Sequence, residues 1–267
     1  MPTVIISQPH APQPQAQARI EALSRTLSAT GWQVLLTPDL YHLPDESPVW
    51  DRLAALDAAA VLGWLHPRAM EWLLRHRGVN CDGWQLFNLQ TTSDASLTAS
   101  LTASGTGGVD TLTGAPADRW YPVVDFSRCT NCRHCLQFCL FGVYELDADG
   151  HVRVTNPDNC KAGCPACSRI CPAGAIMFPL YEDAAIAGAP GEFVERDAEA
   201  RRMFYARTEQ PCPLCAVKTD SEIATITDDG CCPECGRELD AVAPEPSATL
   251  DEIDALIGRL DDLRGGR

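Results

Sequence analysis

The first 90 residues alternate short apolar runs with segments whose apolar positions recur at helical spacing. The pattern predicts strands at Val4–Ile6, Gln33–Thr37, Ala59–Leu65 and Gln85–Leu89, and helices at Ala16–Ala29, Val49–Asp57 and Pro67–Arg77. Pro67 stands in the first turn of the last helix and Gly78 follows its end, as these residue types prefer. Because strands that alternate with helices form βαβ units, residues 1–90 are predicted to be a small α/β domain with a parallel sheet.

The rest of the chain divides by composition. Residues 91–118 are rich in Ser, Thr and Gly and contain no aromatic residue, which predicts a flexible linker. Four segments follow, namely a cysteine-rich block, a charged helical connector, a second cysteine-rich segment and a C-terminal amphipathic helix, at 119–182, 183–210, 211–240 and 249–264. A capping box at Thr249 opens the last helix. This helix either packs on its own domain or docks a partner, and both interpretations stay open.

Composition and charge exclude several classes of protein. The chain has 267 residues, of which 45% are hydrophobic and 21% charged, a balance typical of a folded protein. The longest apolar stretch, residues 53–65, is interrupted by Asp57 and is shorter than the roughly 20 residues of a membrane span. The N-terminus lacks the features of a secretory signal, so a cytoplasmic protein is expected. A net charge of −15 disfavours both nucleic acid and anionic membranes as partners.

Fourteen cysteines carry the candidate chemistry. The cytosol keeps thiols reduced, so they are not expected to form disulfides. All but Cys81 and Cys231 fall into three groups, of which the first two are Cys129-x2-Cys132-x2-Cys135-x3-Cys139 and Cys160-x3-Cys164-x2-Cys167-x3-Cys171. Three closely spaced thiolates on a loop reach three irons of one cubane, whereas the cysteine on the following helix points away and serves another cluster.

This arrangement resembles the bacterial two-cluster [4Fe-4S] ferredoxin family over about residues 120–180. Residues 141–144 and 173–176 match segments that pack across the pseudo-two-fold axis of that family, and a β-hairpin is predicted over 143–154. The resemblance implies a ferredoxin-like fold with two [4Fe-4S] clusters. It also implies crossed ligand sets, with Cys129, Cys132, Cys135 and Cys171 for cluster 1, and Cys139, Cys160, Cys164 and Cys167 for cluster 2.

Two positions depart from the family pattern. Leu140 replaces a proline, which is expected to matter little because leucine can cover a cluster. The spacer between Cys160 and Cys164 is one residue longer than usual, which changes the N–H donors around that cluster. Radical enzymes that cleave S-adenosylmethionine share the spacing of Cys160, Cys164 and Cys167. That interpretation is disfavoured because Cys171 closes the coordination and the 96 residues after it are too few for the barrel of such enzymes.

The third group consists of two C-x2-C knuckles, Cys212 with Cys215 and Cys232 with Cys235. Four thiolates at this spacing suit one tetrahedral ion, and Gly236 lets the second knuckle turn. The segment looks like a zinc ribbon with one structural Zn²⁺. A rubredoxin-type iron site is the alternative, disfavoured because Ala216 replaces the glycine usual after the first knuckle. Cys231 could substitute as a ligand but breaks the spacing.

Other side chains offer no catalytic pattern. His134, inside the first cysteine run, is expected to be a surface side chain, with tuning of a cluster as the alternative. The loop after the first strand is rich in proline and lacks the glycine-rich turn of a phosphate cradle, so a flavodoxin-like cofactor site is not expected. The sequence contains no Ser/His/Asp triad pattern, P-loop or H-E-x-x-H motif.

The sequence therefore predicts a ferredoxin-type electron carrier with accessory domains for partner docking. Its negative charge favours a redox partner with a basic docking surface. A scaffold or interaction protein, in which clusters and zinc are only structural, is the main alternative. An enzyme with a pocket in residues 1–90 is the third possibility, and it is disfavoured.

Overall fold

The computed structural model describes residues 2–11, 13–57 and 59–191, together with Arg202, Cys212, Cys215, Cys232 and residues 235–237. By its internal contacts the chain divides into two compact units, residues 1–201 and 202–267. The first unit holds an α/β sheet and the first two cysteine groups, and the second holds the third group.

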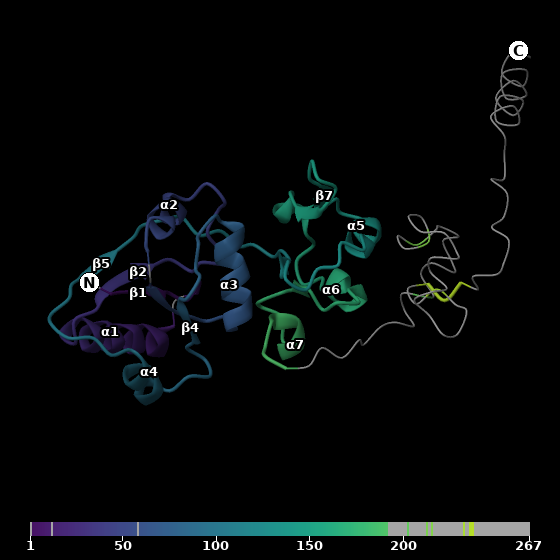
Figure 1. Ribbon diagram of the computed structural model, residues 1–267. Coiled ribbons are helices and arrows are strands. Elements are labelled where there is room, and N and C mark those ends of the chain that lie inside the picture. Colours follow the sequence, from purple (N-terminus) through teal and green to yellow (C-terminus); the bar gives the residue numbers. More distant parts are fainter. Residues whose placement is uncertain are drawn as a thin grey trace, which may run out of the picture. The chain divides into compact units, whose positions relative to one another are not determined.

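A five-stranded parallel sheet forms the N-terminal part (Figure 1). Its strands are β1 (Thr3–Ser7), β2 (Gln33–Thr37), β3 (Ala59–Gly63), β4 (Gln85–Asn88) and β5 (Val109–Thr111), in the order β4-β3-β1-β2-β5. In the register Ile5 lies beside Leu35 on one side and beside Val61 on the other. The predicted parallel sheet of an α/β fold is confirmed, and β5 extends it beyond residue 90.

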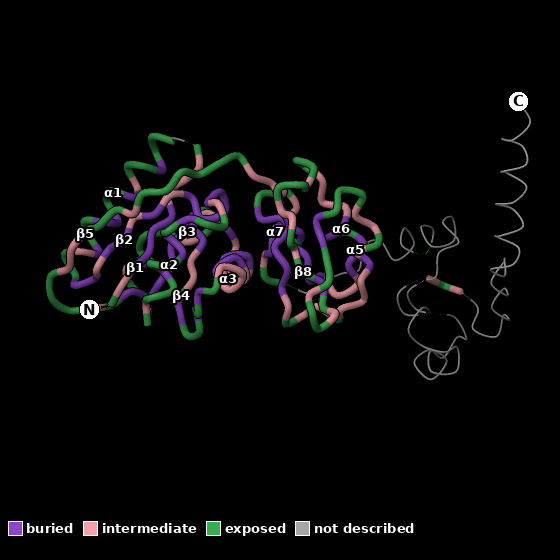
Figure 2. Tube along the Cα trace, turned by 90° about the horizontal axis from the view of Figure 1, so that it is seen from above, coloured by how far each residue is buried: buried purple, intermediate pink, exposed green. Residues whose placement is uncertain are grey.

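Helices cover both faces of this sheet. They are α1 (Pro14–Ala29), α2 (Pro48–Ala54), α3 (Pro67–His76) and α4 (Asp94–Ser100). Side chains alternate along a strand, so Ile5 of β1 packs with α2 and α3, whereas Val4 and Ile6 pack with α1 and α4. Figure 1 shows α1 and α4 on one side of the sheet and α2 on the other. β3 is buried along its whole length, and Figure 2 shows buried positions gathered on the central strands.

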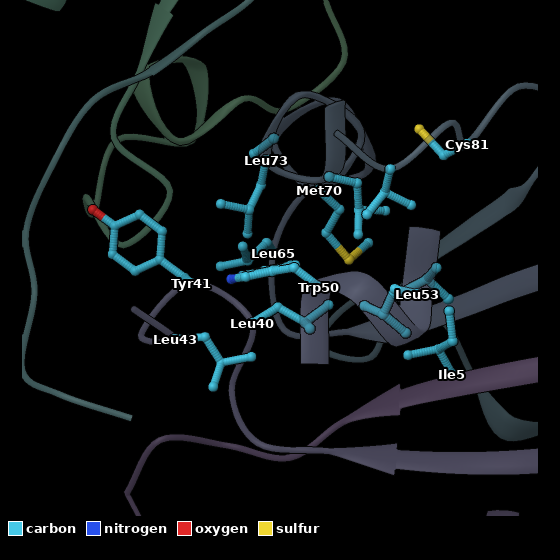
Figure 3. Close-up of a cluster of buried hydrophobic side chains, with 14 of the residues drawn as sticks. Ile5, Leu40, Tyr41, Leu43, Trp50, Leu53, Leu65, Met70, Leu73 and Cys81 are labelled. Atoms are coloured by element: carbon cyan, nitrogen blue, oxygen red, sulfur yellow. The ribbon is translucent and has the colours of Figure 1, made fainter. Parts of the chain in front are cut away.

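The larger core cluster lies between the sheet and helices α2 and α3. Figure 3 shows Met70 and Leu73 extending from α3 toward Trp50 and Leu65. Tyr41 lies in the same cluster, and its hydroxyl donates a 2.7 Å hydrogen bond to the carbonyl of Tyr121, at the start of the cysteine-rich part. The core of the α/β sheet thus continues into the segment that follows.

Residues 91–118 differ from the predicted flexible linker. They contain α4 and β5, and β5 pairs in parallel with β2 at the edge of the sheet. Ser93 caps α4 by accepting a hydrogen bond from the N–H of Ser96, and Leu97 and Leu101 are buried one turn apart in the core. Two leucines and one cap therefore build this segment into the domain despite its polar composition.

The cysteine-rich part consists of short elements. It contains the antiparallel pair β6 (Val123–Val124) and β9 (Ile176–Met177), the hairpin β7 (Tyr144–Leu146) and β8 (Val152–Val154), the helices α5 (His134–Phe138), α6 (Ala166–Ile170) and α7 (Ala184–Ala187), and the 3₁₀ turn η1 (Pro157–Asn159). The hairpin predicted over 143–154 is confirmed. Backbone N–H groups of Asp149 and His151 donate to the carboxylate of Asp147 in its turn.

Arg68 of α3 links the α/β sheet to the cysteine-rich part. Its side chain is 18% exposed and donates to the carbonyl of Gly174 at 2.7 Å. Its Nε lies 3.2 Å from the carboxylate of Asp125, which is 3% exposed. Arg119 adds a second link, because its guanidinium lies 2.9 Å from Asp45 and 2.7 Å from Asp158.

Several predicted segments lie outside the described residues. Of the helical connector predicted at 183–210, the structure describes residues 183–191, which contain α7, and Arg202. Of the zinc-ribbon segment at 211–240, the residues described are the four cysteines, Gly236 and Arg237. The helix predicted at 249–264 and Cys231 lie outside them. Within the described residues, no helix is long and apolar enough to cross a membrane.

Candidate metal centres

The first cysteine loop leads into α5. Asn131 and Arg133, one in each two-residue spacer, have φ angles of 56° and 63°, in the left-handed region that side chains rarely adopt. The turn of the β7–β8 hairpin supports both residues. The amide group of Asn131 donates to the carbonyl of Gly150 at 2.9 Å and accepts from the N–H of Val152 at 2.9 Å, and Arg133 also donates to Gly150. The hairpin therefore holds the loop in a shape that its residue types alone would disfavour.

The second cysteine loop has its extra residue in the spacer of Cys160 and Cys164. Gly163 in this spacer has φ +74°, and nothing lies close to the position of a Cβ atom. The backbone angle, and not lack of space, is therefore the reason that glycine is favoured here. The indole of Trp120 donates to the carbonyl of Cys164 at 3.2 Å, which fixes the end of the loop. The departure from the usual spacing is thus accommodated by a single left-handed glycine.

Charge interactions show which thiols lie together. The side chains of one set line a single small cavity, namely those of Cys129, Cys132, Cys135 and Cys171. Among the thiols, Cys135 interacts most strongly with Cys167 and then with Cys171. Cys167 interacts with Cys139, Cys160 and Cys164. Cys171 is therefore close to thiols of the first loop, and Cys139 is close to thiols of the second. This is the arrangement that crossed ligand sets require.

Hydrogen-bond donors point at two of these sulfurs. The N–H of Ala175 donates to the Sγ of Cys171 at 3.4 Å, and the hydroxyl of Tyr144 donates to the Sγ of Cys167 at 3.1 Å. Burial raises the pKa of Tyr144 well above its usual value, and the neighbouring thiols raise it further. The phenol therefore keeps its proton and remains a donor. Such donors stabilise negative charge on a ligand sulfur and so raise the reduction potential of a cluster.

Four of these thiols, those of Cys135, Cys160, Cys167 and Cys171, have raised pKa values and resist ionisation. Burial raises the pKa of Cys160 to about 12, and repulsion by Cys164 and Cys139 adds to this shift. Burial likewise raises the pKa of Cys135, Cys167 and Cys171. All eight cysteines are buried or half-buried, and a bound cationic metal would stabilise the thiolate form of the four whose pKa is raised.

Two expectations about single residues near the loops need correction. His134 was expected at the surface, but it is 1% exposed because it opens α5 and points inward. Leu140 was expected to cover a cluster, but it is 92% exposed. The exposure of these two side chains cannot be predicted from the sequence alone, because burial of a polar ring and exposure of an apolar side chain both depend on tertiary packing.

The third cysteine group is compact. The four sulfurs of Cys212, Cys215, Cys232 and Cys235 lie within 4.8 Å of one another. Two sulfur pairs, Cys212 with Cys232 and Cys215 with Cys235, are each 3.7 Å apart, too far for a disulfide, which needs about 2.05 Å. A tetrahedron of sulfurs around Zn²⁺ with bonds of about 2.3 Å has edges of about 3.8 Å. Gly236 has φ +71° and donates to the carbonyl of Cys232, as a metal knuckle requires.

The α/β sheet shows no cofactor crevice within the described residues at its topological switch point. In this class of sheet a ligand binds beyond the carboxyl ends of the strands where the strand order reverses, here between β1 and β3. The indole of Trp64 donates to the carbonyl of Ser7 there, and Ser7 accepts from the N–H of Leu40. A space of only about 10 Å³ remains.

Comparison with known proteins identifies the cysteine-rich part. Residues 121–189 match the sequence family described as a 4Fe-4S dicluster domain. The chain is also 46% identical over 61 residues to an uncharacterized ferredoxin of Methanocaldococcus jannaschii, which is 22% of this chain and 41% of the relative. No solved structure matches the chain. The part of the chain from 121 to 189 belongs to the ferredoxin-domain family, and it is an iron–sulfur domain.

Sequence reasoning missed the residues that surround the cysteines. Three of them lie far apart in the sequence: Arg68 bonds to Gly174, Trp120 to Cys164 and Tyr144 to Cys167. Tyr144 lies in the segment 141–144, which the family resemblance places near the clusters, so the sequence did indicate its neighbourhood. Nothing in the sequence indicates the role of Arg68, because this residue lies on α3, outside the cysteine-rich part, and its contacts depend on how α3 packs.

Proposed function

We propose that the protein is a one-electron carrier with two [4Fe-4S] clusters, held by crossed ligand sets. Cys129, Cys132, Cys135 and Cys171 would bind cluster 1, and Cys139, Cys160, Cys164 and Cys167 would bind cluster 2. The observation that carries this proposal is that Cys171 lines the same small cavity as Cys129, Cys132 and Cys135 of the first loop. Cys139 in turn interacts with thiols of the second loop. The dicluster family match supports the same count.

The clusters supply a reversible one-electron oxidation and reduction with little change in geometry. The chain fixes their surroundings. The backbone at Ala175 and the phenol of Tyr144 donate hydrogen bonds to one ligand sulfur of each set, which favours the reduced form. Because these donors are buried and already oriented, little reorganisation accompanies electron transfer.

We place the site of partner docking beside cluster 2. A groove of about 780 Å³ is bordered by Cys160. Four carboxylates line it, from Asp45, Glu46, Asp118 and Asp158, against the single guanidinium of Arg119. This groove supports a partner with a basic docking surface, because opposite charge speeds encounter without requiring a tight complex.

The third cysteine group is proposed to hold one structural Zn²⁺. A closed site with four thiolates leaves no open coordination position, so it suits stabilisation of a short segment rather than catalysis. Sulfur separations of 3.7 Å support a single tetrahedral ion. Rubredoxin-type iron would use the same four ligands, and metal analysis separates the two.

Electron transfer to a basic acceptor tests the proposal. The anaerobic holoprotein is reduced with dithionite, freed of excess reductant and mixed with oxidised cytochrome c, a basic one-electron acceptor. We expect two electrons per chain to reach the acceptor. The rate should fall as the Debye length shrinks from about 10 Å at 0.1 M salt to about 3 Å at 1 M. Reduced protein that transfers no electrons would contradict the carrier function.

A charge-reversal pair tests the groove separately. Glu46→Lys places a positive charge at its rim, whereas Glu21→Lys makes the same change on the exposed surface of α1. Glu46→Lys should slow electron transfer several-fold at low salt, and Glu21→Lys should have a much smaller effect. Equal effects of the two variants would remove the groove as the docking surface and leave the carrier function untouched.

A further inference from the structure

A second cavity lies between the end of α3 and the cysteine-rich part, and Asp45 lines both this cavity and the groove beside Cys160. Its volume is about 390 Å³, within the size range of small-molecule sites. Trp72, Arg75 and Arg77 line it from α3 and the residue after it. Phe126 and Arg153 line it from the cysteine-rich part. No cysteine lines this cavity, and it shares only Asp45 and Pro157 with the lining of the groove beside Cys160.

Arginines outnumber carboxylates among the residues that line the cavity, although the protein as a whole is strongly acidic. Three guanidinium groups line it against one carboxylate, that of Asp45, which is already paired with Arg77. Arg75 and Arg153 each have a carboxylate partner as well, outside the lining of the cavity. Arg77 is 11% exposed, and its Nε is buried with no hydrogen-bond partner among the described residues.

Aromatic rings form the rest of the wall. The rings of Trp72 and Phe126 meet edge to face, with centroids 5.8 Å apart and an angle of 77° between them. The guanidinium of Arg153 lies 4.5 Å from the centroid of Phe126, and that of Arg75 lies 5.7 Å from the centroid of Trp72. These contacts place aromatic rings and guanidinium groups side by side in the wall of the cavity, a combination that suits a ligand with both a ring and an anionic group.

The histidine at this wall adds no charge of its own. The Nε2 of His76 donates to the carbonyl of Val124 at 2.9 Å, and burial lowers the pKa of His76 to about 4. At neutral pH the positive charge of the cavity therefore comes from arginines alone. A ligand that carries both an aromatic ring and a permanent anionic group fits these walls.

We propose that this cavity is a binding site for an aromatic phosphate of mononucleotide size, with the ring against Trp72 and Phe126 and the phosphate on Arg75, Arg77 and Arg153. Flavin and adenine mononucleotides share this chemistry. The site would give the carrier a small-molecule ligand in addition to its clusters.

Calorimetric titration of the anaerobic holoprotein tests the site with four probes. Flavin mononucleotide and AMP carry both recognition elements, riboflavin carries only the ring, and inorganic phosphate carries only the anion. At least one of the two mononucleotides should bind at one site per chain, at least about tenfold more tightly than riboflavin or phosphate. The better of the two identifies the ring. Binding of neither mononucleotide at millimolar concentration would overturn the proposal.

Arginine substitutions locate the site. Arg153→Gln should weaken binding of the better mononucleotide about tenfold or more, because a charge-assisted hydrogen bond is lost. Arg169→Gln is the matched control, since Arg169 also lies over an aromatic ring, that of Tyr181, but does not line the cavity. An unchanged iron content shows that each variant is folded. Arg75→Gln serves as a second test should Arg153→Gln lose its iron. If neither Arg153→Gln nor Arg75→Gln weakened binding, the ligand would bind elsewhere and the proposal would be overturned.

Discussion

Arg68 is expected to couple the stability of the α/β sheet to that of the iron–sulfur domain. Its partners organise both cysteine segments of cluster 1. The carbonyl of Asp125 accepts from the N–H of Cys129, and the N–H of Gly174 donates to the carbonyl of Cys171. Arg68 bonds to the carbonyl of Gly174 and pairs with the carboxylate of Asp125. Arg68→Met keeps the apolar stem of the side chain and removes only the guanidinium.

The size of the effect follows from burial. Loss of one partner of a buried ion pair costs about 3–5 kcal/mol, because the remaining charge stays buried. Asp125 is 3% exposed but keeps two hydrogen bonds from Ser127 and a 3.6 Å pairing with Arg128. We therefore expect the lower end, about 3 kcal/mol, which corresponds to a factor of roughly a hundred in an equilibrium constant.

The assay is the rate at which the holoprotein loses its iron–sulfur absorbance in a fixed concentration of guanidinium chloride under anaerobic conditions. A rate is the proper quantity because cluster loss makes unfolding irreversible. Arg68→Met should bleach tens of times faster than the unmodified protein. Arg128→Met removes the other, 37% exposed partner of Asp125 and should change the rate by a small factor.

A second readout separates electrostatics from packing. The guanidinium of Arg68 interacts with the thiolate of Cys171, so its removal should lower the reduction potential of cluster 1 and leave that of cluster 2 nearly unchanged. A merely structural role of Arg68 would not move the potential. This reasoning would be refuted if Arg68→Met bleached no faster than Arg128→Met and the reduction potentials of both clusters stayed unchanged.

Three further predictions concern the ligand sets and the acidic tail. Cys171→Ala should abolish the paramagnetic signal of cluster 1 and Cys139→Ala that of cluster 2, whereas identical losses would rule out crossed ligands. One zinc per chain should disappear when Cys212 or Cys235 is replaced while both clusters remain, and an iron signal of the rubredoxin type would instead add a third redox centre. Residues 181–267 contain 20 Asp and Glu against 9 Lys and Arg, so deletion of 242–267 should weaken the salt dependence of electron transfer, and an unchanged dependence would assign these charges to solubility.

The sheet was predictable because its strands are short apolar runs and its helices have a clear period. β3 is buried along its whole length, which is typical of a strand in the middle of a parallel sheet. β5 escaped prediction because it is an exposed edge strand with no apolar alternation, and Val109 is 46% exposed. The helix at Asp94–Ser100 escaped because Leu97 is its one buried residue, within a run of Ser, Thr and Ala.

The cysteine groups were predictable because metal ligands must recur at fixed spacing. Their surroundings were not, since these residues come from elements distant in the sequence. Arg68 lies more than 100 residues from Gly174, and no pattern along α3 distinguishes it from the surface arginines. His134 is buried where the loop turns at Arg133, which has a φ of 63°. The spacing of the cysteines does not predict this backbone angle.

A potentiometric titration followed by electron paramagnetic resonance tests the central claim most directly. Anaerobic holoprotein with its full complement of iron is reduced in steps and reoxidised, and the spins are integrated at each potential. Two crossed ligand sets predict two reversible one-electron centres per chain, which reach two spins at full reduction. A maximum of one spin per chain, or a signal that does not return on reoxidation, would contradict an electron carrier with two clusters.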